Sequence, residues 1–324
     1  MNITYFLGAG ASVNIIPLAN EMGARMESFC SKLKDWAEKN KLTSPLEKYI
    51  GKFESLLEEV NNSTSFDDYV KMLSINNEQP KNRDNLKVAK CFLNAYLLFE
   101  QTRNPRTRFD KRYRTFINSV IDPTTKLMPK NLSIITWNYD LQLEICYEDY
   151  ADEYDIEKLQ KKLRIFPSKN SPSDPKIMKL NGTAGLFLDK KDLTPVSIPN
   201  MRFNNDDMFN YIGDNIVANL RSNISNPLLS FAWESTDLVY KVRKFARLVI
   251  EQTEIMIIIG YSFPNLNKEI DKNLFSKVPR LKRIYYQIPG NIDRIKAINP
   301  VLFKKTQHIK DVLTFHYDAA WFDE

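Results

Sequence analysis

Short apolar runs that alternate with longer helical patterns constrain this fold more than any other feature of the sequence. Each run has the length of a buried strand and is far shorter than a membrane span. In chain order the runs are Ile3 to Leu7, Leu132 to Thr136, Lys176 to Leu180, Leu228 to Phe231, Glu254 to Ile259, Arg283 to Ile288 and Val312 to His316. Helical patterns lie between several of them, at Leu141 to Tyr150, Asp237 to Glu251 and Asn267 to Phe275. Strands that alternate with helices predict an α/β fold with a mainly parallel sheet.

A helical block of roughly 100 residues separates the first two runs, and a block of this length is too long for a loop. It covers residues from about 18 to 128, with breakers at Pro45, Pro80, Pro105 and Pro123. We therefore expect a single α/β domain over residues 1–324, in which this block is a large helical insertion after the first strand.

Composition excludes several classes of protein. The net charge of +6 is too small to require a nucleic-acid partner. Cys30, Cys91 and Cys146 are too few and too far apart for a disulfide framework or a zinc site, so we expect no metal. No basic residue precedes Arg25, which argues against a secretory signal. We expect a cytoplasmic protein without a membrane partner.

Four glycines of the chain lie at the ends of apolar runs. Only nine are present, and Gly8, Gly10, Gly182 and Gly260 directly follow such runs. In Gly8 to Ser12, backbone N–H groups with a helix starting behind them would form an anion site. The third glycine of the dinucleotide fingerprint is missing, because Val13 stands there. An ordinary strand–helix turn is the alternative.

Polar residues follow the other strands. Asn138 and Asp140 come directly after the second strand, and Asn181 follows a later one. Polar side chains at the carboxyl ends of parallel strands face the ligand crevice. The alternative for Asn138 and Asp140 is that they cap the next helix, as Asn and Asp often do.

Together these segments resemble the bacterial sirtuin-like NAD-consuming domains, many of which act in antiphage defence by depleting NAD. The matching segments are Gly8 to Ser12, Trp137 to Asp140, Lys179 to Gly182 and Gly260 to Ser262, in the order of the family. The resemblance runs from residue 6 to about residue 264 and implies a Rossmann-like, sirtuin-like sheet. It also implies NAD as substrate or ligand, without a metal.

The resemblance assigns roles by position. Asn138 would orient the ribosyl carbon and the attacking water, and Asp140 would lie near the nicotinamide carboxamide. Gly260 and Ser262 would line the adenosine side, and Gly182 would also contact NAD. The residues that would hold the NAD phosphates and the neighbouring ribose are Gly8, Ala9, Gly10, Ala11 and Ser12. Deacylating sirtuins carry a four-cysteine zinc module, which three scattered cysteines cannot build.

One position departs from the family. Where the family usually has a histidine, this chain has Asn181. Histidine suits general-base work because its pKa lies near neutral, whereas an amide can only hydrogen-bond and position. His308 and His316 are the only histidines, and we expect both to be surface or strand residues rather than a substitute base.

A basic cluster with interleaved aromatic residues precedes the second strand. It reads either as a nucleic-acid or phosphate surface or as a solvated helix face or oligomer contact. Its cations are Arg103, Arg106, Arg108, Lys111, Arg112 and Arg114.

Three functions follow from these features. The first is an NAD glycohydrolase, a defence effector that depletes NAD on activation. The second, which rests on Asn181, is a catalytically weakened NAD or ADP-ribose sensor or scaffold. The third is a nucleic-acid-associated defence subunit. The resemblance also implies a homo-oligomer or a partner such as an ATPase or an Argonaute-like protein, through which nucleic acid would be reached.

Overall fold

The computed structural model describes residues 1–41, 45–76, 78–102, 109–169, 171–189, 192–195, 205–217 and 225–322. The chain divides into two compact units. The sheet unit comprises Met1–Val13, Phe109–Thr183 and Ser230–Glu324, and the helical unit comprises Asn14–Arg108 and Ala184–Leu229.

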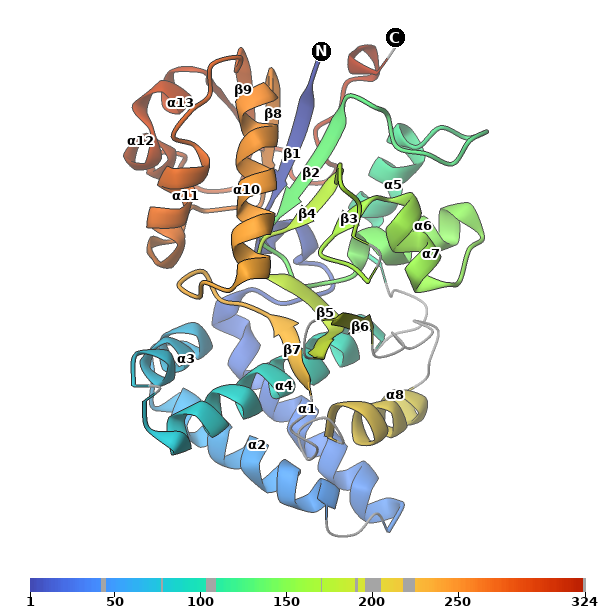
Figure 1. Ribbon diagram of the computed structural model, residues 1–324, viewed down its shortest axis with the longest axis vertical. Helices are drawn as coiled ribbons and strands as arrows, with labels where there is room; N and C mark the ends of the chain where they lie inside the picture. Colours follow the sequence, from blue (N-terminus) through green and yellow to red (C-terminus); the bar gives the residue numbers. More distant parts are fainter. Residues whose placement is uncertain are drawn as a thin grey trace. The chain divides into compact units, whose positions relative to one another are not determined.

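A seven-stranded parallel sheet forms the centre of the sheet unit (Figure 1). Its order is β10-β9-β8-β1-β2-β4-β3, and every pairing along it is parallel. The strands are β1 (Ile3–Leu7), β2 (Leu132–Thr136), β3 (Ile165–Phe166), β4 (Ile177–Lys179), β8 (Ile255–Ile259), β9 (Arg283–Gln287) and β10 (Thr306–Ile309). The predicted α/β fold with a mainly parallel sheet is confirmed.

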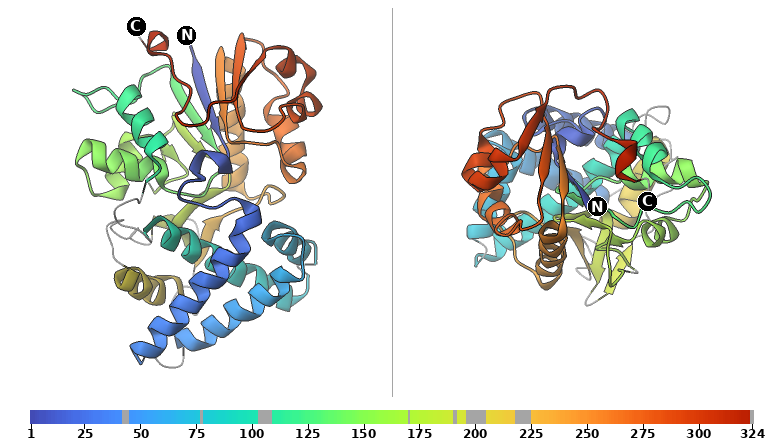
Figure 2. Two further views of the ribbon diagram at one scale, coloured as in Figure 1. Left: turned by 180° about the vertical axis from the view of Figure 1, so that it is seen from behind. Right: turned by 90° about the horizontal axis from the view of Figure 1, so that it is seen from above.

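Helices cover both faces of this sheet (Figure 2). One layer contains α5 (Lys111–Val120), α6 (Gln142–Ala151) and α7 (Ile156–Lys162), and the other contains α10 (Asp237–Gln252), α11 (Lys268–Leu274), α12 (Arg294–Ile298) and α13 (Pro300–Lys304). Because successive strand residues point to opposite faces, Tyr5 packs in the first layer and Phe6 in the second. The central strands therefore contribute side chains to two cores.

The helical unit has an aromatic core and a small sheet of its own. Rings of Phe29, Phe92, Phe99 and Phe209 contact one another at its centre. Pro45 and Pro80 are the first residues of two helices, where a missing N–H costs nothing. The helices are α1 (Ala19–Lys39), α2 (Pro45–Asn61), α3 (Phe66–Ile75), α4 (Pro80–Thr102) and α8 (Asn205–Tyr211), followed by a π-helical turn, η2 (Ile212–Val217); the strands are β5 (Gly182–Asp189), β6 (Asp192–Pro195) and β7 (Ser225–Leu229), in the order β6-β5-β7.

The helical unit differs in extent from the expected block. Helices α1 to α4 fill most of residues 18–128, but α5 packs on the parallel sheet, and Ala184–Leu229 joins the helical unit. The interpretation of the chain as one domain with an insertion stays a prediction.

One strand prediction is wrong, and one predicted strand belongs to the other sheet. Val312 to His316 is not a strand, and the last strand is β10, a half-buried edge strand. The Gln287 side chain donates to the carbonyls of Asp311 and Thr314, so hydrogen bonds from a side chain rather than a ladder hold this segment. The first two residues of the predicted run from Leu228 to Phe231 are the last two residues of β7. This strand belongs to the small sheet and not to the parallel sheet.

Within the described residues, no helix is both long and apolar enough to cross a membrane. Cys30, Cys91 and Cys146 are buried free thiols. The described part of the chain also brings no group of three or more His, Cys, Asp or Glu side chains together in a way that would hold a metal ion.

Candidate active site

The four motifs, far apart in the sequence, follow four adjacent strands of the parallel sheet. Gly8 follows β1, Asn138 follows β2 and Gly260 follows β8, while Asn181 comes two residues after β4. Because the strands are parallel, these ends lie along one edge. Strand β1 has the next strand of the chain, β2, on one side and the much later β8 on the other. This reversal of strand order is the place where α/β sheets bind ligands.

The glycine turn packs directly on the loop after β8. The Gly8 N–H donates to the Ile259 carbonyl at 3.0 Å, and the Gly10 N–H donates to the Gly260 carbonyl at 2.9 Å. Gly260 has φ +61, and a Cβ there would lie 2.3 Å from the Ala11 nitrogen. A Cβ on Gly10 would lie 2.8 Å from the Gly260 Cα. The glycines therefore allow two loops to meet backbone against backbone.

This arrangement changes the reading of the turn as a phosphate cradle. The N–H groups of Gly8, Gly10 and Ala11 already donate to protein carbonyls, so a bound phosphate must find other donors. The expected helix directly behind the turn is replaced by a single 3-10 turn, η1 (Ala9–Ser12). Ala9 is exposed, whereas Ala11 and Ser12 are buried.

We predict that Gly260→Ala destabilises the sheet unit. The new methyl would overlap the Gly10–Ala11 backbone and would hold a non-glycine residue at positive φ, so we expect the free energy of unfolding to fall by about 1–3 kcal/mol or more. Chemical denaturation measures this. Gly290→Ala is the control, because nothing lies within 4 Å of its added Cβ. Equal stability of the two variants would contradict the packing described here.

Asn138 joins the ends of β1 and β2. Its Nδ2 donates to the Gly8 carbonyl at 2.9 Å and to the Ser12 Oγ at 3.1 Å, and its backbone N–H donates to the Thr136 hydroxyl at 3.0 Å. The side chain is buried. With both amide hydrogens used, Asn138 retains its Oδ1 as an acceptor for a ligand hydroxyl or water. The alternative that Asn138 caps the next helix does not describe these contacts.

Asp140 caps the next helix and also lies in the polar cluster at the strand ends. Its Oδ1 accepts from the Gln142 N–H at 3.1 Å, at the first residue of α6, so it satisfies a helix N-terminus. Burial raises the pKa of Asp140, while the Ser12 hydroxyl and the Lys179 ammonium oppose that rise. The carboxyl also lies in the same polar cluster as Ser12.

A buried ion pair next to this cluster contacts the backbone of Asp140. Lys179 Nζ lies 2.6 Å from Glu144 Oε1 and donates to the Asp140 carbonyl at 2.7 Å. The Lys179 and Glu144 side chains are 1% and 0% exposed. The ammonium therefore connects the end of β4 to the start of α6 and fixes the backbone of Asp140.

Asn181 presents an unused acceptor. Its Nδ2 lies 3.5 Å from the Trp137 carbonyl, and its Oδ1 is buried without a hydrogen-bond partner. Gly182 follows with φ 87, and Ser262 is exposed. A buried amide oxygen without a partner is costly unless a ligand or water bonds to it.

Arg112 of the basic cluster and the neighbouring Tyr113 contact the candidate site, which the sequence did not predict. The Arg112 guanidinium donates to the carbonyls of Gly10 (3.3 Å) and Ala11 (2.9 Å) and pairs with Asp110 at 2.5 Å. The Tyr113 hydroxyl lies 3.1 Å from the Ser12 Oγ. Arg112 and Tyr113 are buried. The apolar spacing of Tyr113, Phe116, Ile117 and Val120 was the available signal, because it places this helix face against the core.

Among the described residues, the remaining cations of the basic cluster do not form a basic surface. Arg114 pairs with Asp149 at 3.2 Å, and Lys111 is exposed. Arg103, Arg106 and Arg108 lie outside the described residues.

Both histidines lie in other parts of the sheet unit, and only His308 is the strand residue that was expected, because His316 is half-buried in a segment that is not a strand. His308 Nε2 lies 2.8 Å from the Ile288 carbonyl on the edge strand. The His316 ring packs on Tyr285 and Trp321.

A buried carboxyl lies behind the loop after β8. Tyr261 stacks on Trp137 and donates its hydroxyl to Asp271 Oδ2 at 2.7 Å. Burial raises the pKa of Asp271 to about 8, although the Tyr261 hydroxyl and the Trp137 indole oppose the rise. Asp271 itself is fully buried.

This carboxyl makes stability depend on pH. Between about pH 4 and pH 8 the folded chain keeps a proton that the unfolded chain has lost, so the free energy of unfolding should fall as pH rises, by at most about 1.4 kcal/mol per pH unit. Asp271→Asn should remove that slope and still accept from Tyr261. Denaturation across this window measures it, with the exposed Glu269→Gln as the control. An unchanged slope in Asp271→Asn would contradict the assignment.

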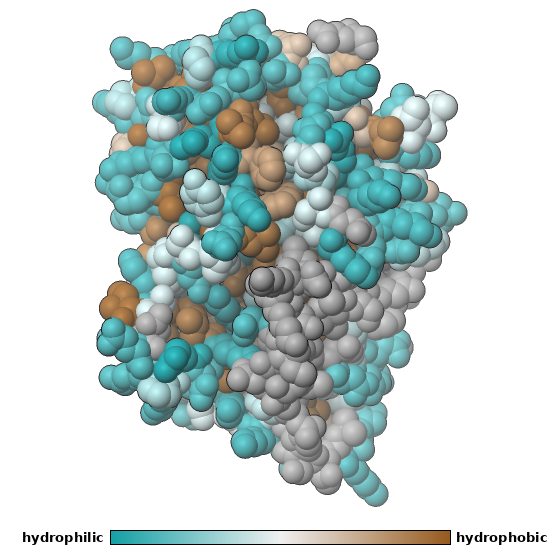
Figure 3. Space-filling view, viewed as in Figure 1, coloured by the Kyte–Doolittle hydropathy of each residue, from teal (hydrophilic) through white to brown (hydrophobic). Residues whose placement is uncertain are grey.

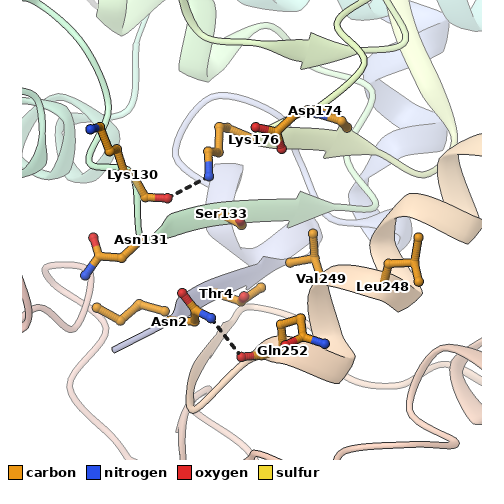
Figure 4. A pocket seen from close by; sticks show the side chains of 12 residues that line it. Asn2, Thr4, Lys130, Asn131, Ser133, Asp174, Lys176, Leu248, Val249 and Gln252 are labelled. Carbon is orange, nitrogen blue, oxygen red and sulfur yellow. Dashed lines mark hydrogen bonds between the residues drawn. The ribbon is translucent and has the colours of Figure 1, made fainter.

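A cavity of about 190 Å³ lies at the opposite, amino-terminal edge of the sheet (Figure 4). Two of its polar side chains are already paired, since Lys176 donates to the Lys130 carbonyl and Asn2 to the Gln252 carbonyl. It is lined by none of the motif residues.

The fold is assigned from the sheet itself, because the comparisons with known proteins add little to it. No protein-family model and no curated protein matches the chain. A solved structure of Sir2 in complex with the inhibitor EX-527, 2'-O-acetyl-ADP-ribose and a deacetylated p53 peptide covers 96% of this chain and 89% of its own. The identity is 9% and the TM-score 0.40, an overlap too low to carry an argument about function.

Proposed function

We propose that this chain is an NAD glycohydrolase whose site is the carboxyl edge of β8, β1, β2 and β4. The observation that carries the proposal is the convergence of four sequence motifs on four adjacent strand ends at the reversal of strand order. Dinucleotides bind parallel α/β sheets at this point of the strand order. The buried acceptor of Asn181 fits a ligand that supplies hydroxyl or amide hydrogens.

In the proposed reaction, the bond between ribose C1′ and the pyridinium nitrogen breaks. The electron pair of that bond neutralises the pyridinium, so nicotinamide leaves without an acid. Water forms the new bond to C1′ and loses a proton, which gives ADP-ribose. Asn138 would position the ribose and the water through its Oδ1, while Asn181 would hydrogen-bond but accept no proton. The proton that the water loses passes to solvent, since neither amide can take it; Asp140 is a buried carboxyl of the same cluster.

A neutral amide at position 181 also favours a second function, a sensor that binds NAD or ADP-ribose without turnover. Calorimetric titration with NAD, followed by product analysis of the same sample, separates the two. We expect binding together with equal amounts of nicotinamide and ADP-ribose. Binding with intact NAD would leave the sensor, and absence of binding would contradict both.

The cellular role belongs to the same proposal. We propose a cytoplasmic defence effector that works as a homo-oligomer or with a partner such as an ATPase or an Argonaute-like protein. The support is the motif resemblance alone. Size measurement of the purified chain tests it, since a strict monomer with full constitutive activity would contradict it.

A further inference from the structure

A second cavity of the sheet unit, of about 310 Å³, lies outside the candidate active site. It is formed by the loop before α10, one face of α10 and part of α11, two helices that lie side by side (Figure 1). Its polar and aromatic lining includes Trp233, Tyr240, Arg243, Lys244, Arg247 and Asn273, together with Glu234. None of these residues belongs to the four motifs.

The lining favours an anion. Three cationic side chains, Arg243, Lys244 and Arg247, face one carboxylate, that of Glu234. The Arg243 guanidinium is held by the carbonyls of Glu234 (3.1 Å) and Phe231 (3.4 Å), and burial lowers its pKa. A bound anion would compensate this partly desolvated charge.

Three donors around the cavity have no acceptor. The indole Nε1 of Trp233 and the guanidinium Nε atoms of Arg243 and Arg247 are buried without a hydrogen-bond partner. The only carboxylate near Arg247 Nε in the described ion pairs is Glu251, at 3.9 Å. Buried donors in native proteins are normally satisfied, and the acceptor oxygens of a bound anion would suit these three.

The aromatic residues add a preference for a planar group. Trp233 stacks on Phe231 with ring centroids 5.0 Å apart, which holds the indole in place. Tyr240 is 66% exposed and offers a free ring on α10. Figure 3 shows this face of the sheet unit, where scattered hydrophobic side chains lie among hydrophilic ones. The cavity volume lies at the lower end of the range for small-molecule sites, roughly 300–1,000 Å³.

We propose that this cavity binds a small phosphorylated ligand with a planar ring, of the nucleoside monophosphate class. The phosphate would accept from Arg247 and Lys244, and the ring would lie against Tyr240 or Trp233. The site is separate from the proposed NAD site and does not depend on it.

Titration calorimetry of the full chain with AMP, adenosine and inorganic phosphate tests this proposal. We expect AMP to bind at least about 10-fold more tightly than either half. Because a charge-assisted hydrogen bond is lost, Arg247→Gln and Lys244→Gln should each weaken AMP binding by roughly 10- to 100-fold. Lys241→Gln, an exposed cation of the same helix outside the cavity, is the control and should change nothing.

Several results would overturn the proposal. Unchanged AMP affinity in both Arg247→Gln and Lys244→Gln would place AMP elsewhere. If inorganic phosphate bound as tightly as AMP, the cavity would be an anion site without a preference for a planar ring. A single-stranded oligonucleotide that binds more tightly than AMP, and loses affinity in the same variants, would instead indicate a nucleic-acid surface.

Discussion

Asn181→His should raise the rate of NAD cleavage by about 10²–10⁴-fold, the usual contribution of a general base. Asn181 is buried, and its Oδ1 has no partner, so an imidazole nitrogen placed there would face the same space. The other ring nitrogen can donate to the Trp137 carbonyl that now lies 3.5 Å from Nδ2. The imidazole would then accept the proton that the attacking water loses, which the amide cannot do.

Steady-state nicotinamide release measures this gain, with Asn181→Gln as the matched control. Glutamine brings a longer side chain but no base, so we expect no gain from it. Adding Asn138→Ala to Asn181→His should remove the gain, because the ribose and water lose their positioning group. Rapid cleavage by the unmodified chain with no response to Asn181→His would contradict this placement, and Asp140, His308 and His316 would then be tested as the base.

Lys179→Met should lower the free energy of unfolding by about 3–5 kcal/mol, because it leaves the Glu144 carboxylate buried without its partner. Both side chains are almost fully enclosed, and their charged atoms lie 2.6 Å apart. Denaturant unfolding measures the loss. Glu144→Leu combined with Lys179→Met should recover most of it, since no charge then remains buried. A double variant as unstable as Lys179→Met would contradict the assignment.

The same substitution has a second readout at the site. The Lys179 ammonium lowers the pKa of Asp140, against the rise that burial causes. Removal of the ammonium should raise that pKa further, so the pH dependence of any Asp140-dependent activity should move to higher pH. Lys176→Met is the control, because its ammonium donates to the Lys130 carbonyl at the other edge of the sheet.

The sheet was predictable because buried parallel strands are continuous apolar runs. Ile255–Ile259 is apolar throughout, while Ile3–Leu7 and Leu132–Thr136 carry only small hydroxyl residues among their apolar ones, and each strand was located within a residue. Thr306–Ile309 escaped because an edge strand pairs on one side only and needs little apolar content. Membership of a sheet is a tertiary property, so the short run that ends β7 gave no sign that it joins the small sheet.

The sequence predicted which polar residues follow the strands of the candidate site, but it did not predict their contacts. Polar residues after strands located Asn138, Asp140 and Asn181. The glycines were predicted to make room for a ligand, but the structure gives another reason for them. Gly10 and Gly260 lie so close that a Cβ on either would overlap the backbone of the other. Gly10→Val would therefore damage folding, and it cannot serve as a specific test of phosphate binding. Arg112 was interpreted as part of a charged cluster because its neighbours in the sequence are also cations. The sequence did not show that its side chain is buried on the apolar face of the helix.

Nicotinamide release from NAD, measured with the purified unmodified chain beside Asn138→Ala, tests the central claim most directly. Thermal unfolding of both samples should accompany it, since Asn138→Ala also removes buried hydrogen bonds to Gly8 and Ser12. We predict measurable release by the unmodified chain and a loss of at least about 10²-fold in the folded variant, because misplacement of a positioned reactant costs that much. Equal release by the two folded proteins would contradict a site at the carboxyl edge of β1 and β2.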